Sequence, residues 1–379
     1  MGANAAAPCV PSRGRLAMKP QRGFTLIEAM LALGLSLVLL SAAVVMLIGA
    51  QQTAATLAAT ARAQANLQLA FSVIERGLQR AGNFGCVHPQ RPLFTMLRGA
   101  LSQLPEYDLS RPVVGYEALA FGGYAPNPAA TLPLSGAGGD YRVHHAGHGI
   151  DLDKLKSGAD LLVVRVLGPS APLGAASADF APLVVLGESL EYAADDVVLV
   201  SDCEQATLLK VTAIETLASG AELSWADGPG PFDNSRAAVA VGSSRQRAAA
   251  VPKGYGADAM VALVETLFFY LAPSLVENRQ GNLATALWLK RGPARGVELV
   301  AGIDNLQVWF LAAAGAESSS PIGYFDAQHL PAQARIVGIR VLLRSTSIDG
   351  LGVFADQPLS FTGVRTFMLP RFAGPGWPL

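Results

Sequence analysis

Charged residues are scarce in this sequence of 379 residues, in which Asp, Glu, Lys and Arg together make up 15%. The 28 basic and 29 acidic residues nearly cancel, and the formal net charge is −1. This balance argues against a strongly basic protein that binds nucleic acid. Hydrophobic residues make up 51% of the chain, which excludes intrinsic disorder. We therefore expect a folded, hydrophobic protein with no nucleic-acid partner.

The short motifs of common catalytic sites are also missing. There is no phosphate-binding loop, His-Glu-x-x-His, Gly-x-Ser-x-Gly or Cys-x-x-Cys. One cluster has residues that bind metals, and its His144 and His148 stand four positions apart. Gly147 and Gly149 argue against a helix that would align them. We interpret the cluster as a polar loop and expect no metal, cofactor or catalytic residue; its members are Asp140, His144, His145, His148, Asp151 and Asp153.

The hydrophobicity is concentrated near the N-terminus. Between Phe24 and Ala61 the only charged residue is Glu28, and Ala29–Ile48 holds nothing more polar than two serines. About 20 apolar residues in a helix span a bilayer. The basic residues ahead of this segment predict a cytoplasmic N-terminus, with the rest of the chain across the membrane; they are Arg13, Arg15, Lys19 and Arg22.

Three interpretations compete for this segment. A cleaved secretory signal peptide has an apolar core of about 7–15 residues, which is shorter than this one. An ordinary single-pass anchor gains nothing from Glu28, because a charge in a membrane helix is costly. The third interpretation is cleavage between Gly23 and Phe24. Glu28 would then face the new α-amine of Phe24 across one helical turn, and the helix dipole would favour its charge.

The seven residues from Arg22 to Glu28, Arg-Gly-Phe-Thr-Leu-Ile-Glu, resemble the type IV prepilin processing signal. The resemblance implies that prepilin peptidase cleaves after Gly23, that the Phe24 amine is N-methylated, and that Glu28 guides assembly by charge pairing. Residues 1–23 form a long leader for this family. Because Met18 opens a compact leader of six residues, we expect translation to begin there and residues 1–17 to be untranslated.

The helical pattern continues beyond the apolar segment. Leu67, Phe71, Ile74 and Leu78 follow the spacing of one helix face, and Gly82 is suited to a helix C-terminus. We expect one helix over 24–82, with its first half transmembrane. The remainder, 83–379, predicts a β-rich extracytoplasmic head with few helices. Strand-like runs are Leu161–Leu167, Val197–Val200, Leu208–Ile214, Leu263–Leu271, Ala286–Leu289, Leu306–Leu311, Ile336–Leu343 and Phe361–Leu369.

The expected fold class is therefore α+β and pilin-like: a long N-terminal helix packed through its C-terminal half on a mainly antiparallel sheet. Several segments narrow the resemblance to the PilW family of minor pilins. They are Ala70–Cys86, Ser157–Arg165, Val200–Cys203, Glu298–Gln307 and Val337–Ser345. The chain departs from the family pattern at Gly77, which stands for an acid, at Asn83, which stands for an aromatic residue, and near the C-terminus, where Arg371-Phe372 replaces Arg-Asn.

Cysteine is rare, with three residues in the chain. Cys9 would be lost with the leader, and Cys86 and Cys203 would remain where disulfides persist. We expect them to form one disulfide that ties the helix end to the sheet, with two free buried thiols as the alternative. Removal of residues 1–23 takes away four basic residues and no acid. The mature chain is therefore more acidic than the precursor.

The resemblance implies a non-enzymatic minor pilin that helps to initiate type IV pilus assembly within a minor-pilin complex or tip complex. Its partners would be other minor pilins and the major pilin, and it would sit in the inner membrane with a periplasmic head before it enters the pilus. A minor pseudopilin of type II secretion shares the signal and the helix. A membrane-anchored periplasmic enzyme is the more remote alternative, and it would need a polar cleft of converging titratable groups.

Overall fold

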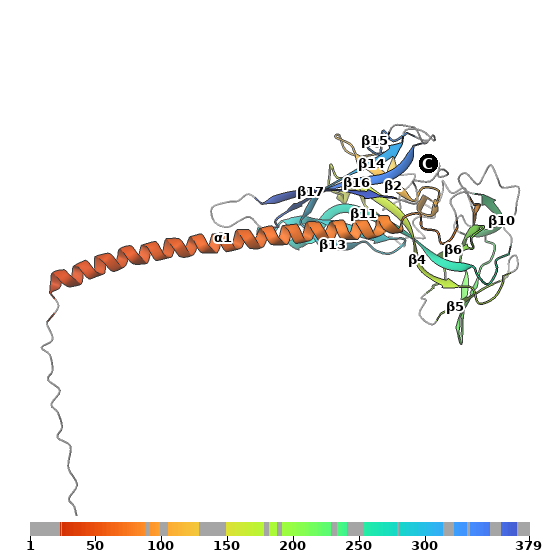
Figure 1. Ribbon diagram of the computed structural model, residues 1–379, viewed down its shortest axis with the longest axis horizontal. Helices are drawn as coiled ribbons and strands as arrows, with labels where there is room; N and C mark the ends of the chain where they lie inside the picture. Colours follow the sequence, from red (N-terminus) through yellow and green to blue (C-terminus); the bar gives the residue numbers. More distant parts are fainter. Residues whose placement is uncertain are drawn as a thin grey trace, which may run out of the picture. The chain divides into compact units, whose positions relative to one another are not determined.

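A single long helix, α1 (Leu26–Arg80), precedes strands in three sheets (Figure 1). The computed structural model describes residues 23, 25–87, 91–98, 105–128, 149–177, 182–187, 192–228, 233–240, 254–278, 280–313, 322–331, 334–348 and 358–369. The chain divides within α1 into two compact units, Met1–Ala55 and Thr56–Leu379. The predicted fold class is confirmed: a long apolar helix is followed by a mainly antiparallel β-sheet domain, which gives a pilin-like α+β fold.

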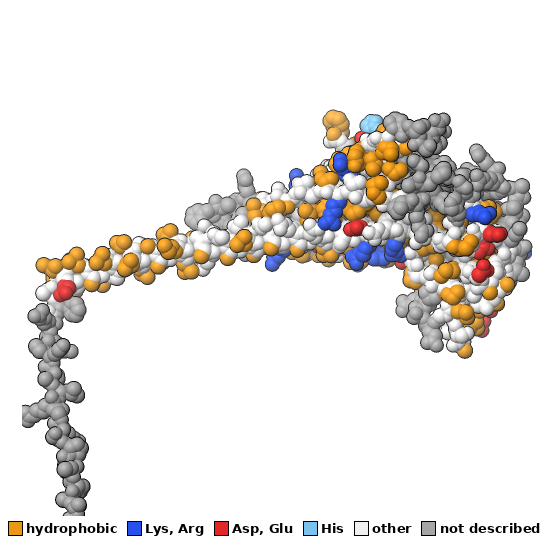
Figure 2. All heavy atoms as spheres, in the orientation of Figure 1, with side chains coloured by type: hydrophobic (Ala, Val, Ile, Leu, Met, Phe, Trp, Pro, Cys, Tyr) orange, Lys and Arg blue, Asp and Glu red, His pale blue; other side chains and the backbone are white. Residues whose placement is uncertain are grey.

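In the first unit, α1 exposes apolar side chains along its length, and Figure 2 shows those on one face. Met30 and Leu40 are each 66% exposed. The hydroxyls of Ser36 and Ser41 donate to the carbonyls of Leu33 and Val38, so the polar groups of this segment are satisfied within the helix itself. By length and composition, α1 is the one helix in the described part of the chain that is suited to crossing a membrane.

In the second unit, the rest of α1 buries the predicted stripe. Leu67, Phe71, Ile74 and Leu78 are each at most 8% exposed and belong to the largest hydrophobic core. The helix ends at Arg80, two residues before the predicted end. Gly82 has φ 63°, the left-handed conformation that glycine adopts readily after a helix.

The large sheet has ten strands in the described residues. Its order is β10-β1-β7-β6-β11-β4-β2-β3, and β12 and β13 extend from the second half of β11. All pairs are antiparallel except β1 with β7. Its strands are β1 (Leu93–Leu97), β2 (Val113–Ala118), β3 (Tyr124–Ala125), β4 (Leu161–Pro172), β6 (Val197–Ser201), β7 (Ala206–Lys210), β10 (Asn234–Ala240), β11 (Met260–Glu277), β12 (Leu283–Arg291) and β13 (Val297–Ala301).

Two smaller antiparallel sheets complete the second unit. The four-stranded sheet has the order β15-β14-β16-β17 and the three-stranded sheet the order β5-β9-β8. Their strands are β5 (Leu183–Leu186), β8 (Ala213–Leu217), β9 (Gly220–Ser224), β14 (Ile303–Ala313), β15 (Ile322–Phe325), β16 (Arg335–Thr346) and β17 (Ser360–Met368). In the described part of the chain, two short 3-10 helices, η2 (Pro105–Tyr107) and η4 (Leu152–Lys154), precede strands of the large sheet.

Most of the predicted strands coincide with observed ones, and one prediction is wrong. The expected strand Leu208–Ile214 is divided, because β7 ends at Lys210 and β8 begins at Ala213. The Val211 N–H donates to the carbonyl of Asp196, and the Thr212 N–H donates to that of Ser224. The chain leaves the large sheet at this point and enters the three-stranded one. A continuous apolar run does not reveal such a change of partner.

The largest core lies where α1 meets the large and four-stranded sheets. Gly77 explains how closely the helix approaches β11. A Cβ atom at this position would lie 3.3 Å from two atoms of the Phe269 ring and 3.4 Å from a methyl carbon of Leu267. Gly77 therefore provides the room in which Phe269 packs.

We predict that Gly77→Val lowers the free energy of unfolding by about 1–3 kcal/mol, because the added side chain overpacks the contact with Phe269. Urea unfolding of the whole chain in detergent measures the change. Ala65→Val, at an exposed position of the same helix, is the matched control and should cost well under 1 kcal/mol. Equal losses in both variants would contradict the packing explanation.

Candidate processing and assembly site

The predicted cleavage junction leads directly into the start of α1. Thr25 caps the helix: its side-chain oxygen accepts from the Glu28 N–H at 3.3 Å, and its carbonyl accepts from the Ala29 N–H at 3.1 Å. A threonine three residues before a glutamate is a signature of a helix N-terminus. This cap places Glu28 in the first turn of α1, where the helix dipole favours a carboxylate.

Gly23 and Glu28 are both exposed, whereas Phe24 lies outside the described residues. The exposed Gly23 is open to an incoming peptidase. Cleavage there would start the chain at Phe24, one helical turn from Glu28, since residues four apart share a helix face. A carboxylate so placed can neutralise a neighbouring amine in a medium where unpaired charge is costly.

A disulfide joins Cys86 to Cys203, with the two Cα atoms 4.8 Å apart. Cys86 lies just after the end of α1, and Cys203 lies in the turn between β6 and β7. Gly85 makes the approach possible, because a Cβ atom there would lie 2.9 Å from the hydroxyl of Ser201. The bond ties the end of the helix to the large sheet.

A cluster of titratable groups lies where the large and four-stranded sheets meet. Asp160 is 2% exposed. Its carboxylate accepts from the Ala118 N–H on β2 at 2.9 Å and from the Val308 N–H on β14 at 2.8 Å. One carboxylate thus links the two sheets. Burial raises the pKa of Asp160 to about 6, although the two backbone N–H groups oppose the shift.

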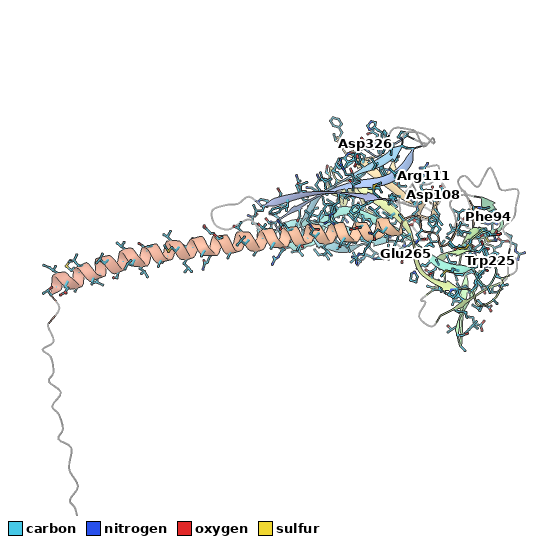
Figure 3. All side chains as sticks on the ribbon, in the orientation of Figure 1. Phe94, Asp108, Arg111, Trp225, Glu265 and Asp326 are labelled. Atoms are coloured by element: carbon cyan, nitrogen blue, oxygen red, sulfur yellow. A yellow bond between two sulfur atoms is a disulfide. The ribbon has the colours of Figure 1, made fainter. Side chains whose placement is uncertain are left out.

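Glu117 on β2 belongs to the same cluster. Burial is the main cause that raises its pKa to about 7; the charges of Asp160 and Asp326 contribute to the rise, and His329 opposes it. Asp326 follows β15 (Figure 3) and pairs with the His329 ring at 2.7 Å. The raised pKa values of Glu117 and Asp160 make the stability of the fold sensitive to pH near neutrality. Within the described residues, no group of three or more His, Cys, Asp or Glu is arranged to hold a metal ion.

Buried cations elsewhere bond to the backbone. Lys290 on β12 is 1% exposed, and its ammonium donates to the carbonyls of Gly292 and Ala294 at 2.7 and 2.8 Å. Burial lowers the pKa of Lys290 to about 8, and Glu106 opposes the shift. Arg165 on β4 is 2% exposed and donates to the carbonyl of Arg111. Both side chains hold turns against the sheet.

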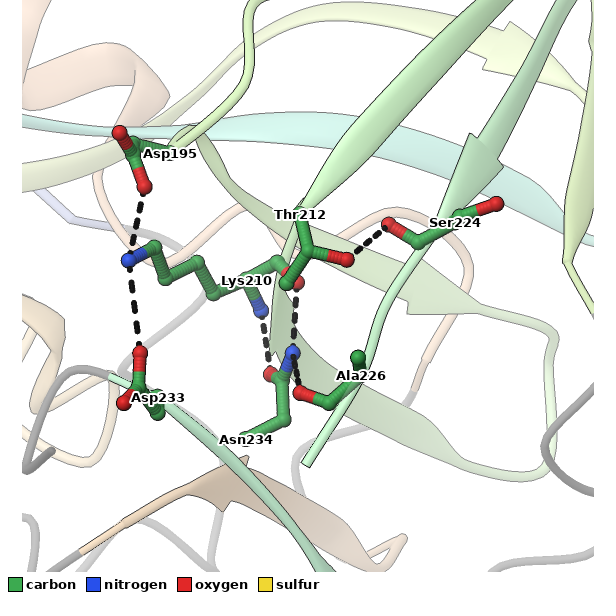
Figure 4. A network of polar contacts seen from close by, with 7 residues as sticks. All are labelled: Asp195, Lys210, Thr212, Ser224, Ala226, Asp233 and Asn234. Carbon is green, nitrogen blue, oxygen red and sulfur yellow. Dashed lines mark hydrogen bonds and ion pairs between the residues drawn. The ribbon is translucent and has the colours of Figure 1, made fainter. Parts of the chain in front are cut away.

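A second polar network fastens the end of β7 (Figure 4). The Asn234 side chain accepts from the Lys210 N–H and donates to the Lys210 carbonyl, both at 2.7 Å, in the manner of a paired strand. The Lys210 ammonium lies between Asp195 and Asp233, at 2.8 and 3.7 Å. The arrangement neutralises the lysine and has a structural role in fixing β10 to β7.

The histidines of the sequence-predicted polar loop, His144, His145 and His148, lie outside the described residues, as does Asp140. Of that cluster, the structure describes Asp151 and Asp153. Asp151 caps η4 by accepting from the Asp153 N–H, and it forms an ion pair with Lys154 at 3.2 Å. These two acids therefore serve the local turn.

Sequence reasoning missed Thr25 and the Asp160 cluster. The Thr-x-x-Glu spacing was a usable signal for Thr25. Asp160 stands directly before a long apolar strand, and a polar residue at such a position is usually an exposed turn residue. Its partners Ala118 and Val308 stand far away in the sequence, so only the fold shows that it is buried between two sheets.

We predict that the thermal midpoint of the whole chain in detergent rises as pH falls from 8 to 5. The folded-state pKa values of Glu117 and Asp160, about 7 and about 6, exceed the unfolded values near 4. Their stabilising contribution is therefore complete below about pH 4 and is lost as pH rises through about 6–7. Glu117→Gln should flatten the profile, whereas Glu215→Gln, at an exposed position, should leave it unchanged. A profile unaltered by Glu117→Gln would contradict this account.

We predict that reduction of the Cys86–Cys203 disulfide lowers stability by about 4–5 kcal/mol in the chain-entropy model, because it closes a loop with a sequence separation of 117. Thermal unfolding with and without reductant measures the loss. Mass mapping of the unreduced mature protein should recover the two cysteine peptides as one cross-linked species. Two thiols that alkylate without reduction would argue against the bond.

Comparison with known proteins supports the processing junction. Residues 18–49 match the prokaryotic N-terminal methylation motif. Curated proteins give no match to the chain. The matched segment contains Gly23, Phe24 and Glu28 and ends within α1. The motif implies processing by prepilin peptidase, assembly with other pilins, membrane anchoring and incorporation into a pilus-type filament. The chain therefore carries a type IV pilin-like prepilin signal on a pilin-like α+β fold, which supports a subunit of the pilin or pseudopilin type.

Proposed function

We propose that this chain is a minor pilin of the PilW kind, a structural subunit that helps to initiate type IV pilus assembly as part of a minor-pilin complex. In this proposal, residues 1–23 are the leader, 24–82 the helix and 83–379 the periplasmic head. Before assembly, the protein spans the inner membrane once through the first half of α1. The observation that carries the proposal is the methylation motif at residues 18–49, continuous with a capped apolar helix.

The proposed mechanism of assembly is electrostatic and hydrophobic. The mature α1 packs laterally against helices of sister subunits, and its apolar surface between Leu26 and Ile48 supplies the contact area. Glu28 pairs with the methylated N-terminal amine of a neighbour. In an apolar medium such a pair is favoured because each charge offsets the desolvation free energy of the other. The pairing therefore fixes how far neighbouring helices are shifted relative to each other along their axes.

The contacts among the segments that resemble PilW support the finer assignment. The Gly82 N–H donates to the Arg165 carbonyl at 3.4 Å, and the Asp160 N–H donates to the Leu306 carbonyl at 2.9 Å. Arg344 pairs with Asp304 at 2.8 Å. Together with the Cys86–Cys203 bond, these contacts join all five segments. Residues that resemble the family but stand far apart in sequence thus form one connected network.

We further propose that the role is non-enzymatic. Three buried charged groups of the described residues, Asp160, Arg165 and Lys290, bond to backbone groups and link elements of the fold. A pseudopilin of type II secretion has the same signal and helix, and neighbouring genes distinguish the two systems. Genes for other minor pilins beside this one favour the pilus, and secretion genes favour the pseudopilin.

We predict that Glu28→Ala leaves leader cleavage intact but reduces co-purification with other pilin-type subunits about tenfold or more. The variant removes the charge that pairs with a neighbour's amine, whereas the peptidase acts at Gly23. Mass spectrometry of the mature N-terminus measures processing, and quantitative pull-down from membranes measures association. Ser36→Ala is the matched control, since its hydroxyl is satisfied within its own helix. Wild-type co-purification of Glu28→Ala would count against the mechanism.

A further inference from the structure

Strand β17 forms one end of the four-stranded sheet. It pairs with β16 from Ser360 to Met368 in a register without a bulge. Among the strands that the structure describes, none pairs with its other edge. Figure 1 shows β17 running alongside the C-terminal half of α1.

The outward backbone groups of β17 can be assigned from its ladder. The Leu369 N–H donates to the Val337 carbonyl, and the Ser347 N–H donates to the Leu359 carbonyl. Hydrogen-bonded pairs alternate along an antiparallel ladder, so the odd-numbered residues of β17 bond to β16. The N–H and C=O groups of Thr362, Val364 and Thr366 therefore point away from the sheet, at the free edge.

The exposed side chains of β17 do not protect this edge. Val364 is 52% and Met368 60% exposed, and the other exposed residues of the strand are Ser360, Thr362 and Thr366. None of the five carries a charge, and none is proline. Natural proteins usually guard a long edge strand with lysine, proline, a bulge or a covering segment. Within the described residues, this edge of nine residues has none of these guards, and it offers a template for pairing with another strand.

The inner face of β17 is held firmly on α1. The Arg365 guanidinium lies 4.9 Å from the centre of the Phe71 ring, and it also donates to Gln68. The Phe367 and Phe71 rings are 6.5 Å apart. At Gly363, a Cβ atom would lie 2.8 Å from the Phe71 ring, so the strand and the helix are in close contact. An edge fixed in this way pays little ordering entropy when a partner strand binds.

We propose that the free edge of β17 accepts an extended strand from the head of a different pilin-type subunit. Main-chain hydrogen bonds would supply affinity, and contacts with Val364 and Met368 would supply specificity. The choice of partner rests on the assembly that the prepilin signal implies. The same strand packs on the part of α1 that leaves Gln68 and Leu69 exposed, so an added strand would continue an interface between neighbouring helices.

Pairing of β17 with β17 of a second copy does not fit this assembly. Antiparallel pairing of identical edges needs a two-fold axis, which would reverse the direction of the α1 segment beneath the strand. Subunits inserted through the same basic leader share one direction. The partner strand therefore belongs to a different pilin-type protein and not to a second copy of this chain.

Photo-crosslinking in the native host tests the proposal with three separate probes. A benzophenone amino acid replaces Thr366 at the edge, Thr216 on β8 as an exposed edge-strand control, or Leu40 in the apolar part of α1. The Thr366 probe should give adducts with head residues of another protein that carries a prepilin signal, at least tenfold above the Thr216 probe. The Leu40 probe reports helix assembly independently of the edge.

A backbone variant gives the second measurement. Val364→Pro removes an outward N–H and leaves the β16 ladder intact, so it should retain the wild-type thermal midpoint and reduce the adduct formed by the Thr366 probe at least fivefold. If proline prevents folding, Val364→Lys places a guarding charge at the same position and should have the same effect on the adduct.

Each remaining outcome has a defined meaning. Leu40 adducts with pilin-type subunits but none from Thr366 would overturn the edge proposal and leave the pilin function standing. Absence of both adducts would overturn the edge proposal and the proposed function together. Thr366 adducts with a second copy of this chain, or with a protein that lacks a prepilin signal, would overturn the proposed partner.

Discussion

Burial of one face of α1 is the constraint on which the second unit depends. Leu67, Phe71, Ile74 and Leu78 place their side chains between the large and four-stranded sheets. Neither sheet could cover its apolar face alone, because the strands that contact the helix are rich in buried leucine, isoleucine and valine. The helix is therefore a structural layer of the head as well as its continuation toward the membrane segment. Assembly through one end of α1 and folding around the other use the same continuous element.

Polar groups complete this architecture at the places where apolar packing alone cannot choose a geometry. Asp160 accepts one hydrogen bond from each of two sheets. Asn234 imitates a strand at the end of β7. Directional bonds at a sheet boundary fix the relative position of elements that hydrophobic contact would allow to slide. A raised pKa at Asp160 is the cost of placing a carboxylate at such a boundary.

The parts of the fold that could be predicted from sequence are those with a strong local pattern. The apolar run and the 4-3-4 stripe predict α1, and the continuous apolar runs predict β4, β6 and β16, which are largely buried. The strands β5, β9 and β13 were missed because they are short and their burial is incomplete. The cleavage junction could be predicted from the sequence because its chemistry is local: Gly23, Thr25 and Glu28 lie within six residues of one another. The cluster around Asp160 was not, since its members come from separate strands.

The disulfide at the end of α1 also decides how the chain carries load. A filament subunit is pulled between its helix and its head, and tension passes along the shortest covalent route. Because Cys86 and Cys203 are joined with Cα atoms 4.8 Å apart, the force bypasses the segment between them, which spans a sequence separation of 117. Strands β1 to β6 lie outside that covalent route, in the loop that the disulfide closes. Tension reaches the later strands directly, and it is passed to β1, β4 and β6 through their hydrogen bonds with β7 and β11.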